Sequence, residues 1–335
     1  MINYQRILEI IKANNVFVIT THINPDGDAI GSELALAYFL QKMNKEFKII
    51  NHSSTPENFV FLDQENLIHK YDSSFDEYIM NADVVIAVDF NTLGRVKSMM
   101  EIFKKTKAYK IIIDHHRNPQ NFVDEIFSDV DAPATGILIY ELIKAYDSNF
   151  IDKKTADALY TAIMTDTGSF RFERITPEVH IIVADLISRG TNPTYIYNKV
   201  YNEINPEKLR LLGVTISNIK LEMDGKIAYM VIDRELLKKY VPSEEEFDVD
   251  GFVNYCLSLK STIVGMLFFE IKNGVKVSLR SKEKFPVNLL AEKFGGGGHL
   301  NAAGIRLEGE KLNDVISKVI NQTIEDLKNY ERDLS

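Results

Sequence analysis

Four short apolar runs rich in β-branched residues punctuate the first half of the chain, and segments with apolar residues at helical spacing separate them. Such runs are typical of strands that are covered on both faces of a parallel sheet. The segments between them supply the crossover helices that parallel strands require. The first half is therefore predicted to be an α/β domain, with strands at 16–20, 47–51, 83–90 and 109–116.

Helical spacing of apolar residues predicts a helix at 29–43, directly after the first strand. Proline fits the first turn of a helix, so Thr176 and Pro177 mark the start of another one. The first fifteen residues have the pattern of an amphipathic helix. The remaining helices of this half are predicted at 134–146, 153–165 and 177–189.

Turn-forming residues cluster after residue 190, and a charged helical segment follows Pro206. We therefore expect a first domain at 1–190, a helical linker region at 191–220 and a smaller α+β domain at 221–335. Strands in the last domain are predicted at 227–233, 262–271 and 275–281, followed by a glycine cluster and a closing helix.

Length and composition agree with a two-domain globular protein. A chain of 335 residues exceeds the usual size of one compact core. Its 45% of hydrophobic and 26% of charged residues are ordinary values. No apolar run approaches the roughly 18 to 20 residues that span a membrane. We therefore expect a cytoplasmic protein that does not bind membranes.

Cysteine content and charge restrict the chemistry further. Cys256 is the single cysteine, which excludes an internal disulfide and a cysteine-rich zinc site. Any metal must then use oxygen and imidazole ligands. The formal net charge of −9 disfavours binding to long duplex nucleic acid and favours small anionic ligands.

Residue types that bind metals follow the predicted strands and one helix of the first domain. Because all strands of a parallel sheet end at one edge, these side chains should converge there. The candidates are His22, Asp26 and Asp28 after the first strand, Asp89 after the third, Asp114, His115 and His116 after the fourth, and Asp166 after the helix at 153–165.

Carboxylates and imidazoles without thiolates suit manganese or magnesium ahead of zinc. Several carboxylates in one crevice would repel each other unless cations were bound. Two cations about 3.5 to 4 Å apart activate water and clamp both oxygens in phosphoester hydrolysis. The pattern therefore predicts a two-metal phosphoesterase. In the alternative interpretation, the aspartates are helix caps and turn formers, and His116 is a structural histidine bonded to the backbone.

The glycine cluster "FGGGGHLNAAG" near the C-terminus is a second candidate site. Glycine loses the most backbone entropy on ordering, so the run is not expected inside a strand or helix. Backbone N–H groups of such a run can approach an anion closely. We interpret it as a substrate loop, and the alternative is a flexible loop without a ligand.

These motifs together resemble a known family. "HINPDGDAIGS", the aspartate of "VIAVDF", "IIIDHH" and "TDTGSFRF" resemble, in order, the four motifs of the DHH phosphoesterases. "VSLRSK" followed by "FGGGGHLNAAG" resembles the DHH-associated C-terminal domain. The resemblance spans nearly the whole chain. It is strongest to the stand-alone nanoRNase/pAp phosphatases and related dinucleotide phosphodiesterases.

The resemblance implies a role for each candidate ligand. One manganese would be held by His22, Asp26 and Asp89. The other would be held by Asp28, Asp89, His115 and Asp166, which makes Asp89 the bridge. Magnesium and cobalt are the alternative cations.

Two further residues would complete the catalytic site. Asp114 would orient His115, because metal-bound imidazoles generally need such a partner. His116 would bind the scissile phosphate or protonate the leaving oxygen.

Substrate residues are implied in the same way. Arg280 and His299 would bind the terminal phosphate and the nucleotide, since an arginine fork meets two phosphate oxygens. Ser278 and Asn301 are weaker candidates, and Arg171 is either a substrate residue or part of a strand surface. The other predicted substrate residues are Ser281, Gly296, Gly297 and Gly298.

The implied activity is manganese-dependent hydrolysis of short oligoribonucleotides and linear dinucleotides (nanoRNA, pApA, pGpG) to mononucleotides, and of pAp to AMP. The implied assembly is a homodimer. A cyclic-di-AMP phosphodiesterase and a non-catalytic nucleotide sensor are the alternatives. A family-II-like pyrophosphatase is disfavoured, because that group carries a different C-terminal domain.

Overall fold

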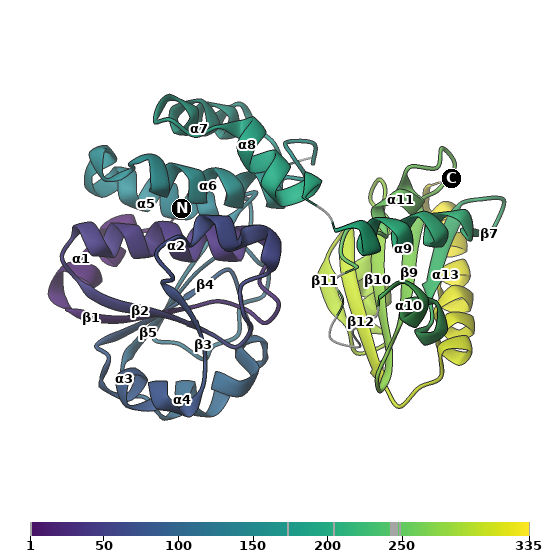
Figure 1. The fold of residues 1–335 in the computed structure, drawn as a ribbon, viewed down its shortest axis with the longest axis horizontal. Helices are drawn as coiled ribbons and strands as arrows, with labels where there is room; N and C mark the ends of the chain where they lie inside the picture. Colours follow the sequence, from purple (N-terminus) through teal and green to yellow (C-terminus); the bar gives the residue numbers. More distant parts are fainter. Residues whose placement is uncertain (1, 173, 204, 242–246, 248, 335) are drawn as a thin grey trace. The chain divides into compact units, whose positions relative to one another are not determined.

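The computed structural model describes residues 2–172, 174–203, 205–241, 247 and 249–334. The chain forms two compact units, Met1–Glu203 and Ile204–Ser335, each with a six-stranded sheet (Figure 1). The segment at 191–220, expected as a linker, is divided between them. Helix α8 (Pro193–Tyr197) belongs to the first unit, and α9 (Pro206–Ser217) belongs to the second.

The first unit contains a parallel sheet of order β3-β2-β1-β4-β5-β6. The four predicted strands form its centre, as β1 (Val16–Thr20), β2 (Glu46–Asn51), β4 (Val84–Val88) and β5 (Tyr109–Asp114). The edge strands β3 (Ile68–Lys70) and β6 (Glu125–Ser128) were not predicted. They are short and only partly buried, so they lack the continuous apolar run that identifies a central strand.

Helices cover both faces of this sheet (Figure 1). Helices α1 (Tyr4–Ala13), α2 (Gly27–Lys42), α5 (Thr135–Asp147) and α6 (Lys153–Asp166) pack on one face, and α7 (Pro177–Ser188) and α8 pack on α6. Helices α3 (Asp76–Asn81) and α4 (Met100–Lys105) lie on the other. Short 3₁₀ segments span Glu57–Leu62, Ser73–Phe75, Leu93–Met99 and Ser148–Phe150, and a π-helical turn spans Asn198–Asn202.

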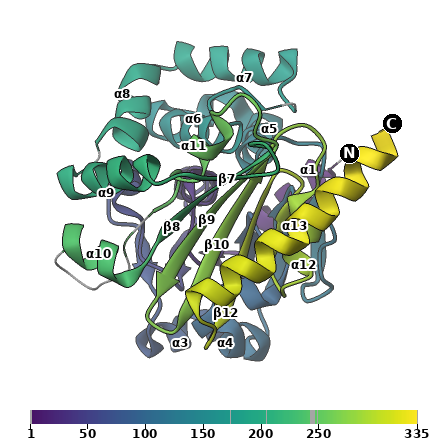
Figure 2. The same cartoon turned by 90° about the vertical axis from the view of Figure 1, so that its right-hand side faces the viewer.

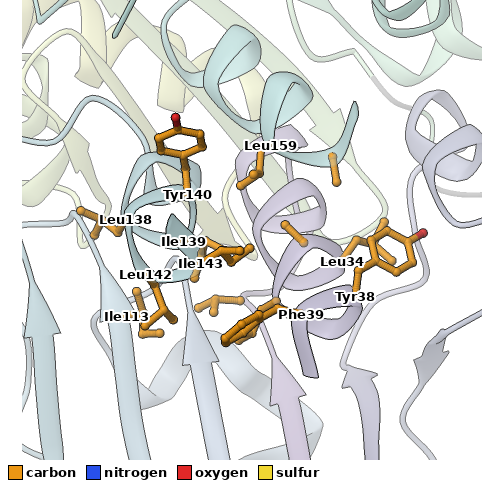
Figure 3. Packing of buried hydrophobic residues seen from close by; sticks show 14 of the residues in the cluster. Leu34, Tyr38, Phe39, Ile113, Leu138, Ile139, Tyr140, Leu142, Ile143 and Leu159 are labelled. Carbon is orange, nitrogen blue, oxygen red and sulfur yellow. The ribbon is translucent and has the colours of Figure 1, made fainter. Parts of the chain in front are cut away.

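The main core of the first unit lies between the sheet and the helices α2, α5 and α6. Figure 3 shows Phe39 of α2 among side chains of α5 and Ile113 of β5. Helix α2 approaches α6 very closely, because Gly31 has no side chain. A Cβ atom at Gly31 would lie 2.3 Å from the carbonyl oxygen of Ala158 on α6. This close packing brings the start of α2 near the end of α6.

The second unit contains a sheet of order β11-β12-β10-β9-β8-β7, antiparallel except for the β8–β9 pair. One face packs on α12 (Val287–Glu292) and α13 (Leu312–Leu334), as Figure 2 shows for α13. The opposite face packs on α9, α10 (Arg234–Tyr240) and α11 (Asn254–Leu257). The strands are β7 (Lys220–Glu222), β8 (Ile227–Ile232), β9 (Val264–Ile271), β10 (Gly274–Ser281), β11 (Gly297–His299) and β12 (Ala302–Glu308). The predicted α/β first domain and smaller α+β second domain are thus confirmed.

The glycine cluster was predicted to be a loop outside any strand, and this prediction is wrong for part of it. Part of it is a strand, because Gly297 and Gly298 in β11 pair with Gly304 and Ala303 in β12. A Cβ atom at Gly298, where φ is +149°, would lie 2.4 Å from the carbonyl oxygen of Ala302. Close approach between two backbones therefore requires glycine here, and this outweighs the entropy cost that predicted a loop.

No helix in the described part of the chain is long and apolar enough to cross a membrane.

Candidate metal centre and substrate residues

The predicted ligands of the first unit lie together at the carboxyl edge of its sheet. They form three overlapping groups, and within each group the ligand atoms lie within 4.8 Å of one another. These groups are His22, Asp26 and Asp89; Asp28, His115 and Asp166; and Asp89, His115 and His116. The parallel sheet accounts for this convergence, because β1, β4 and β5 end at the same edge.

His22, directly after β1, is oriented by the backbone. Its Nδ1 lies 2.8 Å from the carbonyl oxygen of Ile23. A carbonyl oxygen only accepts, so Nδ1 is the donor, and Nε2 is the ring nitrogen that is left to face a cation. That Nε2 atom lies 3.5 Å from Oδ2 of Asp89 and 4.0 Å from Oδ2 of Asp26. Nε2 and the two carboxylates form an arrangement that fits a divalent cation.

Asp26 serves as both helix cap and candidate ligand. Its Oδ1 accepts the backbone N–H groups of Asp28 and Ala29, at 3.0 and 3.1 Å, and so caps α2. Its Oδ2 is the atom nearest His22. The cap interpretation and the ligand interpretation are therefore compatible.

His115, directly after β5, is oriented in the same way as His22. Its Nδ1 donates to the carbonyl oxygen of Ala132 at 3.0 Å. Its Nε2 lies 3.4 Å from Oδ2 of Asp166 and 3.8 Å from Oδ2 of Asp28. Nε2 also lies 3.6 Å from Oδ1 of Asp89, whose other oxygen faces His22. One carboxylate thus lies between the two histidines.

The backbone at Asp89 has a positive φ of 63°, which is uncommon for a residue other than glycine. Its carboxylate is buried, and the hydroxyl of Thr135 donates to Oδ1 at 2.9 Å. Strain of this kind persists where the surrounding structure holds it, and it concentrates at functional sites.

Asp28 is bound by the N-terminus of α5. The backbone N–H groups of Thr135 and Gly136 donate to its two oxygens at 2.6 and 2.9 Å, and the hydroxyl of Ser32 donates at 3.1 Å. Helix N-termini stabilise negative charge. Thr135 therefore supports both Asp28 and Asp89. Sequence reasoning missed it, since its sequence signal is only that of a residue at the start of a helix.

Electrostatics favour cations at this edge of the sheet. Burial raises the pKa of Asp28 well above its usual range, and the charges of Asp89 and Asp166 add to the effect. Burial likewise raises the pKa of Asp166 to about 7. Burial alone would raise the pKa of Asp89 too, but hydrogen bonding and charge from the surrounding histidines hold it below its usual value. Divalent cations would compensate the crowded carboxylates, so the donor set fits such ions.

Asp114 does not orient His115 as expected. Its Oδ1 accepts a hydrogen bond from Nδ1 of His116 at 2.7 Å, while His115 contacts the Ala132 carbonyl. Asp114 and His116 are two positions apart, so their side chains leave the chain on the same side of an extended backbone. Burial lowers the pKa of His116, but the hydrogen bond that it donates to Asp114 and the charge of Asp89 outweigh this effect and raise that pKa. The partner of His116 Nδ1 is thus a carboxylate rather than the backbone.

In the second unit, Arg280 is half-buried on β10, between Ala302 of β12 and Gly265 of β9. Its Nη1 donates to the carbonyl oxygen of Leu279 at 3.0 Å. Burial lowers the pKa of its guanidinium. Among the described residues, no carboxylate lies within ion-pair distance of Arg280. This partly desolvated cation suits an anionic ligand.

Other predicted substrate residues have different environments. Ser281 is buried; its hydroxyl donates to the carbonyl oxygen of Phe285 at 2.7 Å and accepts from Asn301 at 3.0 Å. The geometry therefore favours a structural role for Ser281 and Asn301, because the hydroxyl proton is already used within a turn. The backbone of His299 lies in β11, but its side chain falls outside the part of the chain that the structure describes.

Arg171 lies in a turn and not on a strand surface. It is exposed, and its Nε donates to the carbonyl oxygen of Gly168 at 2.6 Å. The backbone of Gly168, Ser169 and Phe170 has positive φ at each residue, which excludes an extended strand. The strand alternative for Arg171 is therefore wrong.

Comparison with known families divides the chain as the fold does. The DHH family, N-terminal domain, matches residues 16–163. The DHHA1 domain matches residues 225–326.

Similar proteins match over nearly the full length. A Thermus thermophilus protein named bifunctional oligoribonuclease and PAP phosphatase NrnA is 29% identical, over 96% of this chain and 93% of its own. A Bacillus subtilis protein of the same name is 26% identical, over 89% and 91%. The crystal structure of an exopolyphosphatase-related protein from Bacteroides fragilis gives a TM-score of 0.89 at 33% identity, covering 98% of this chain and 96% of that one.

Proposed function

Because this chain belongs to the DHH family and carries a DHHA1 domain, we propose that it is a metal-dependent nucleotide phosphoesterase acting on short oligoribonucleotides and linear dinucleotides. Its products would be mononucleotides, and pAp would be a second substrate, cleaved to AMP. The observation that carries the proposal is the position of Asp89, whose two oxygens lie 3.5 and 3.6 Å from the Nε2 atoms of His22 and His115. A carboxylate between two groups of ligands is what a two-metal site requires.

The two groups of ligands would each hold one divalent cation, with manganese favoured and magnesium or cobalt as alternatives. When bound, such cations supply Lewis acidity and positive charge at a phosphoryl group. Within the chain, the carbonyl oxygens of Ile23 and Ala132 fix the histidine tautomers, and Thr135 holds the shared carboxylate. The first group is His22, Asp26 and Asp89, and the second is Asp28, Asp89, His115 and Asp166.

His116 is the proposed proton donor to the leaving oxygen, with its imidazole oriented by Asp114. In the second unit, Arg280 would bind the terminal phosphate of the substrate with a charge-assisted hydrogen bond. His299 and the glycines Gly296, Gly297 and Gly298 would complete that binding site. The names of the relatives from Thermus thermophilus and Bacillus subtilis support this class of substrate.

The decisive experiment measures initial rates with manganese on pAp, on oligoribonucleotides of two to five residues, and on pGpG, pApA and cyclic-di-AMP, with pyrophosphate as a control. We expect the highest kcat/KM on linear dinucleotides and short oligoribonucleotides. A higher kcat/KM on cyclic-di-AMP than on the linear substrates would identify the protein as a cyclic-dinucleotide phosphodiesterase. Nucleotide binding without turnover would indicate a sensor. Hydrolysis of pyrophosphate alone would refute the proposal.

Asp89→Ala tests the metal centre directly. Loss of the shared carboxylate should lower kcat/KM by roughly 10³-fold or more, since metal ions contribute several kcal/mol to stabilising the transition state. Circular dichroism checks that the fold is retained. Near-normal turnover by a folded Asp89→Ala protein would contradict the assignment.

The homodimer implied by the family resemblance is part of the proposal. Multi-angle light scattering on the purified chain would give its mass in solution, and a mass near 38.2 kDa would contradict a dimer.

A further inference from the structure

Glu33 on α2 is a fully buried carboxylate that lies outside the three groups of metal ligands. Among the described residues, no cationic side chain lies within ion-pair distance of it. Its hydrogen-bonding partner is Asn51, the last residue of β2, whose side-chain NH₂ lies 2.9 Å from Oε1 and 3.0 Å from Oε2. Burying a carboxylate costs free energy unless its hydrogen bonds are made. We therefore expect this buried pair to fix the position of a neighbouring part of the chain.

The other side of the Asn51 amide holds the chain at the end of β1. Its Oδ1 accepts the backbone N–H of Thr21 at 3.0 Å. Because a backbone N–H can only donate, the amide oxygen must face Thr21 and the NH₂ group must face Glu33. The orientation of Asn51 is thus determined by both partners. All three residues are fully buried, with relative exposures of 0%.

Thr21 connects this pair to the metal ligands. It immediately precedes His22 in the chain, and its hydroxyl donates to the carbonyl oxygen of Val88 at 2.8 Å. Val88 immediately precedes Asp89. A shift of Thr21 would therefore displace both His22 and Asp89, the two residues of the first group that face each other at 3.5 Å.

We propose that Glu33 and Asn51 are positioning residues, which form a buried clamp that holds Thr21 and so places His22 and Asp89 for a divalent cation. The inference rests on the metal centre of the proposed function and is independent of the substrate. The clamp acts as the outer hydrogen-bonding partners of metal ligands generally do, by limiting how far the ligands can move. It extends this support to the backbone that carries the ligands.

The test is Mn²⁺ binding measured by isothermal titration calorimetry without nucleotide. Glu33→Met has a similar length but no acceptor for the Asn51 amide, and we expect its Mn²⁺ dissociation constant to rise about 10-fold or more. Glu33→Gln keeps one side-chain oxygen for that amide, but its own NH₂ group replaces the second acceptor, so we expect a smaller rise than in Glu33→Met. Asn51→Ser, whose hydroxyl cannot reach both partners, is a second variant that should weaken binding like Glu33→Met.

Tyr38→Phe is the matched control, because it removes another buried hydrogen bond of the same helix, from the Tyr38 hydroxyl to the Leu62 carbonyl oxygen at 3.1 Å. It should lower stability without changing the Mn²⁺ dissociation constant. Hydrogen exchange at the Thr21 amide is an independent readout. In Glu33→Met, exchange at Thr21 should accelerate by more than the loss of global stability explains. In Tyr38→Phe, it should change only as much as the loss of global stability predicts.

Each result decides the inference. Weakened Mn²⁺ binding in Glu33→Met and Asn51→Ser, with a smaller effect in Glu33→Gln, supports the clamp. The clamp is overturned if Glu33→Met and Asn51→Ser both bind Mn²⁺ as tightly as the wild type, or if Tyr38→Phe weakens Mn²⁺ binding as much as they do. A wild-type protein that binds Mn²⁺ but hydrolyses no nucleotide would refute the proposed function and leave the clamp intact. Absence of Mn²⁺ binding by the wild-type protein would overturn both.

Discussion

At the scale of single residues, the candidate site is built from groups that each make two kinds of contact. Asp26 caps α2 with one oxygen and faces His22 with the other. Thr135 donates its backbone N–H to Asp28 and its hydroxyl to Asp89. Such sharing makes the positions of the ligands interdependent, because moving one residue disturbs two contacts.

The two roles of Asp26 can be separated by Asp26→Ser. Serine caps helices about as well as aspartate, so the free energy of unfolding should stay within about 0.5 kcal/mol of wild type. Loss of the carboxylate should weaken Mn²⁺ binding by roughly 10-fold or more. Urea unfolding and calorimetric Mn²⁺ titration measure the two effects. Asp152→Ser, at the cap of α6, is the control and should leave Mn²⁺ binding unchanged. Unaltered Mn²⁺ binding in Asp26→Ser would show that Asp26 is a cap alone.

The raised pKa of Asp166 predicts a pH dependence of stability in the metal-free protein. Between its usual value of 3.8 and about 7, folded Asp166 keeps a proton that the unfolded chain releases. Stability therefore falls as pH rises through this window. The raised pKa of His116 also lowers stability as the pH rises above 6.5. The lowered pKa of Asp89 affects stability only below pH 3.8.

Mn²⁺ should reverse this trend, because it binds the ionised carboxylates. We expect saturating Mn²⁺ to raise the Tm by about 5 °C or more at pH 7.5, and by much less at pH 5. Differential scanning fluorimetry at both pH values, with calcium as a comparison cation, measures the effect. An equal gain at pH 5 and pH 7.5 would be inconsistent with cation binding at these carboxylates.

At the scale of elements, two helices and three strand ends bring the ligands together. Asp28 lies in the first turn of α2 and Asp166 ends α6. These helices meet where Gly31 faces the backbone of α6. The distance between Asp28 and Asp166 therefore depends on a helix contact that only glycine allows.

Gly31→Ala tests this helix contact. The added Cβ atom would lie 2.3 Å from the Ala158 carbonyl oxygen, so α2 and α6 must move apart. We expect a loss of about 1–3 kcal/mol in the free energy of unfolding, together with weaker Mn²⁺ binding. Gly213→Ala in α9 is the control, since its Cβ atom would meet no described atom within 4 Å. There alanine should stabilise the protein by up to about 1 kcal/mol. A Gly31→Ala protein as stable as wild type would rule out the close contact.

At the scale of the whole molecule, each unit carries a different part of the proposed function. The first unit holds all of the candidate metal ligands, and the second unit holds Arg280 and the glycine cluster. Metal affinity and substrate affinity should therefore respond to different substitutions.

Arg280→Met should raise the KM for linear dinucleotides by about 10-fold or more, the effect of losing one hydrogen bond between charged groups. The Mn²⁺ dissociation constant should not change. Arg306→Met is the matched control, because Arg306 is an exposed arginine on β12 of the same sheet. Steady-state kinetics and calorimetry on both proteins make the comparison. An unchanged KM in Arg280→Met would remove Arg280 from the proposed substrate site.

Local sequence signals were sufficient for the central elements of the fold. Strands β1, β2, β4 and β5 are continuous apolar runs, and α2, α5, α6 and α7 have helical spacing, so burial on both faces or on one stripe is visible in the residues themselves. Edge strands β3, β6 and β7 have no such signal, because their pairing depends on a neighbouring strand. The hairpin of β11 and β12 was not predicted for a different reason. Its glycines allow two backbones to approach closely, and a glycine run is more typical of a loop than of a strand.

The sequence by itself determined which chemistry is available, because residue types and their positions after parallel strands are local properties. It placed imidazoles and carboxylates without thiolates at one sheet edge. Only the tertiary structure decided how these groups pair. Asp114 accepts a hydrogen bond from His116, while His115 donates to the Ala132 carbonyl. Thr135 supports Asp28 and Asp89 from more than forty residues away, and Asn51 links Glu33 to Thr21. These contacts depend on strand register and helix packing, which join residues far apart in the chain and leave no trace in local spacing.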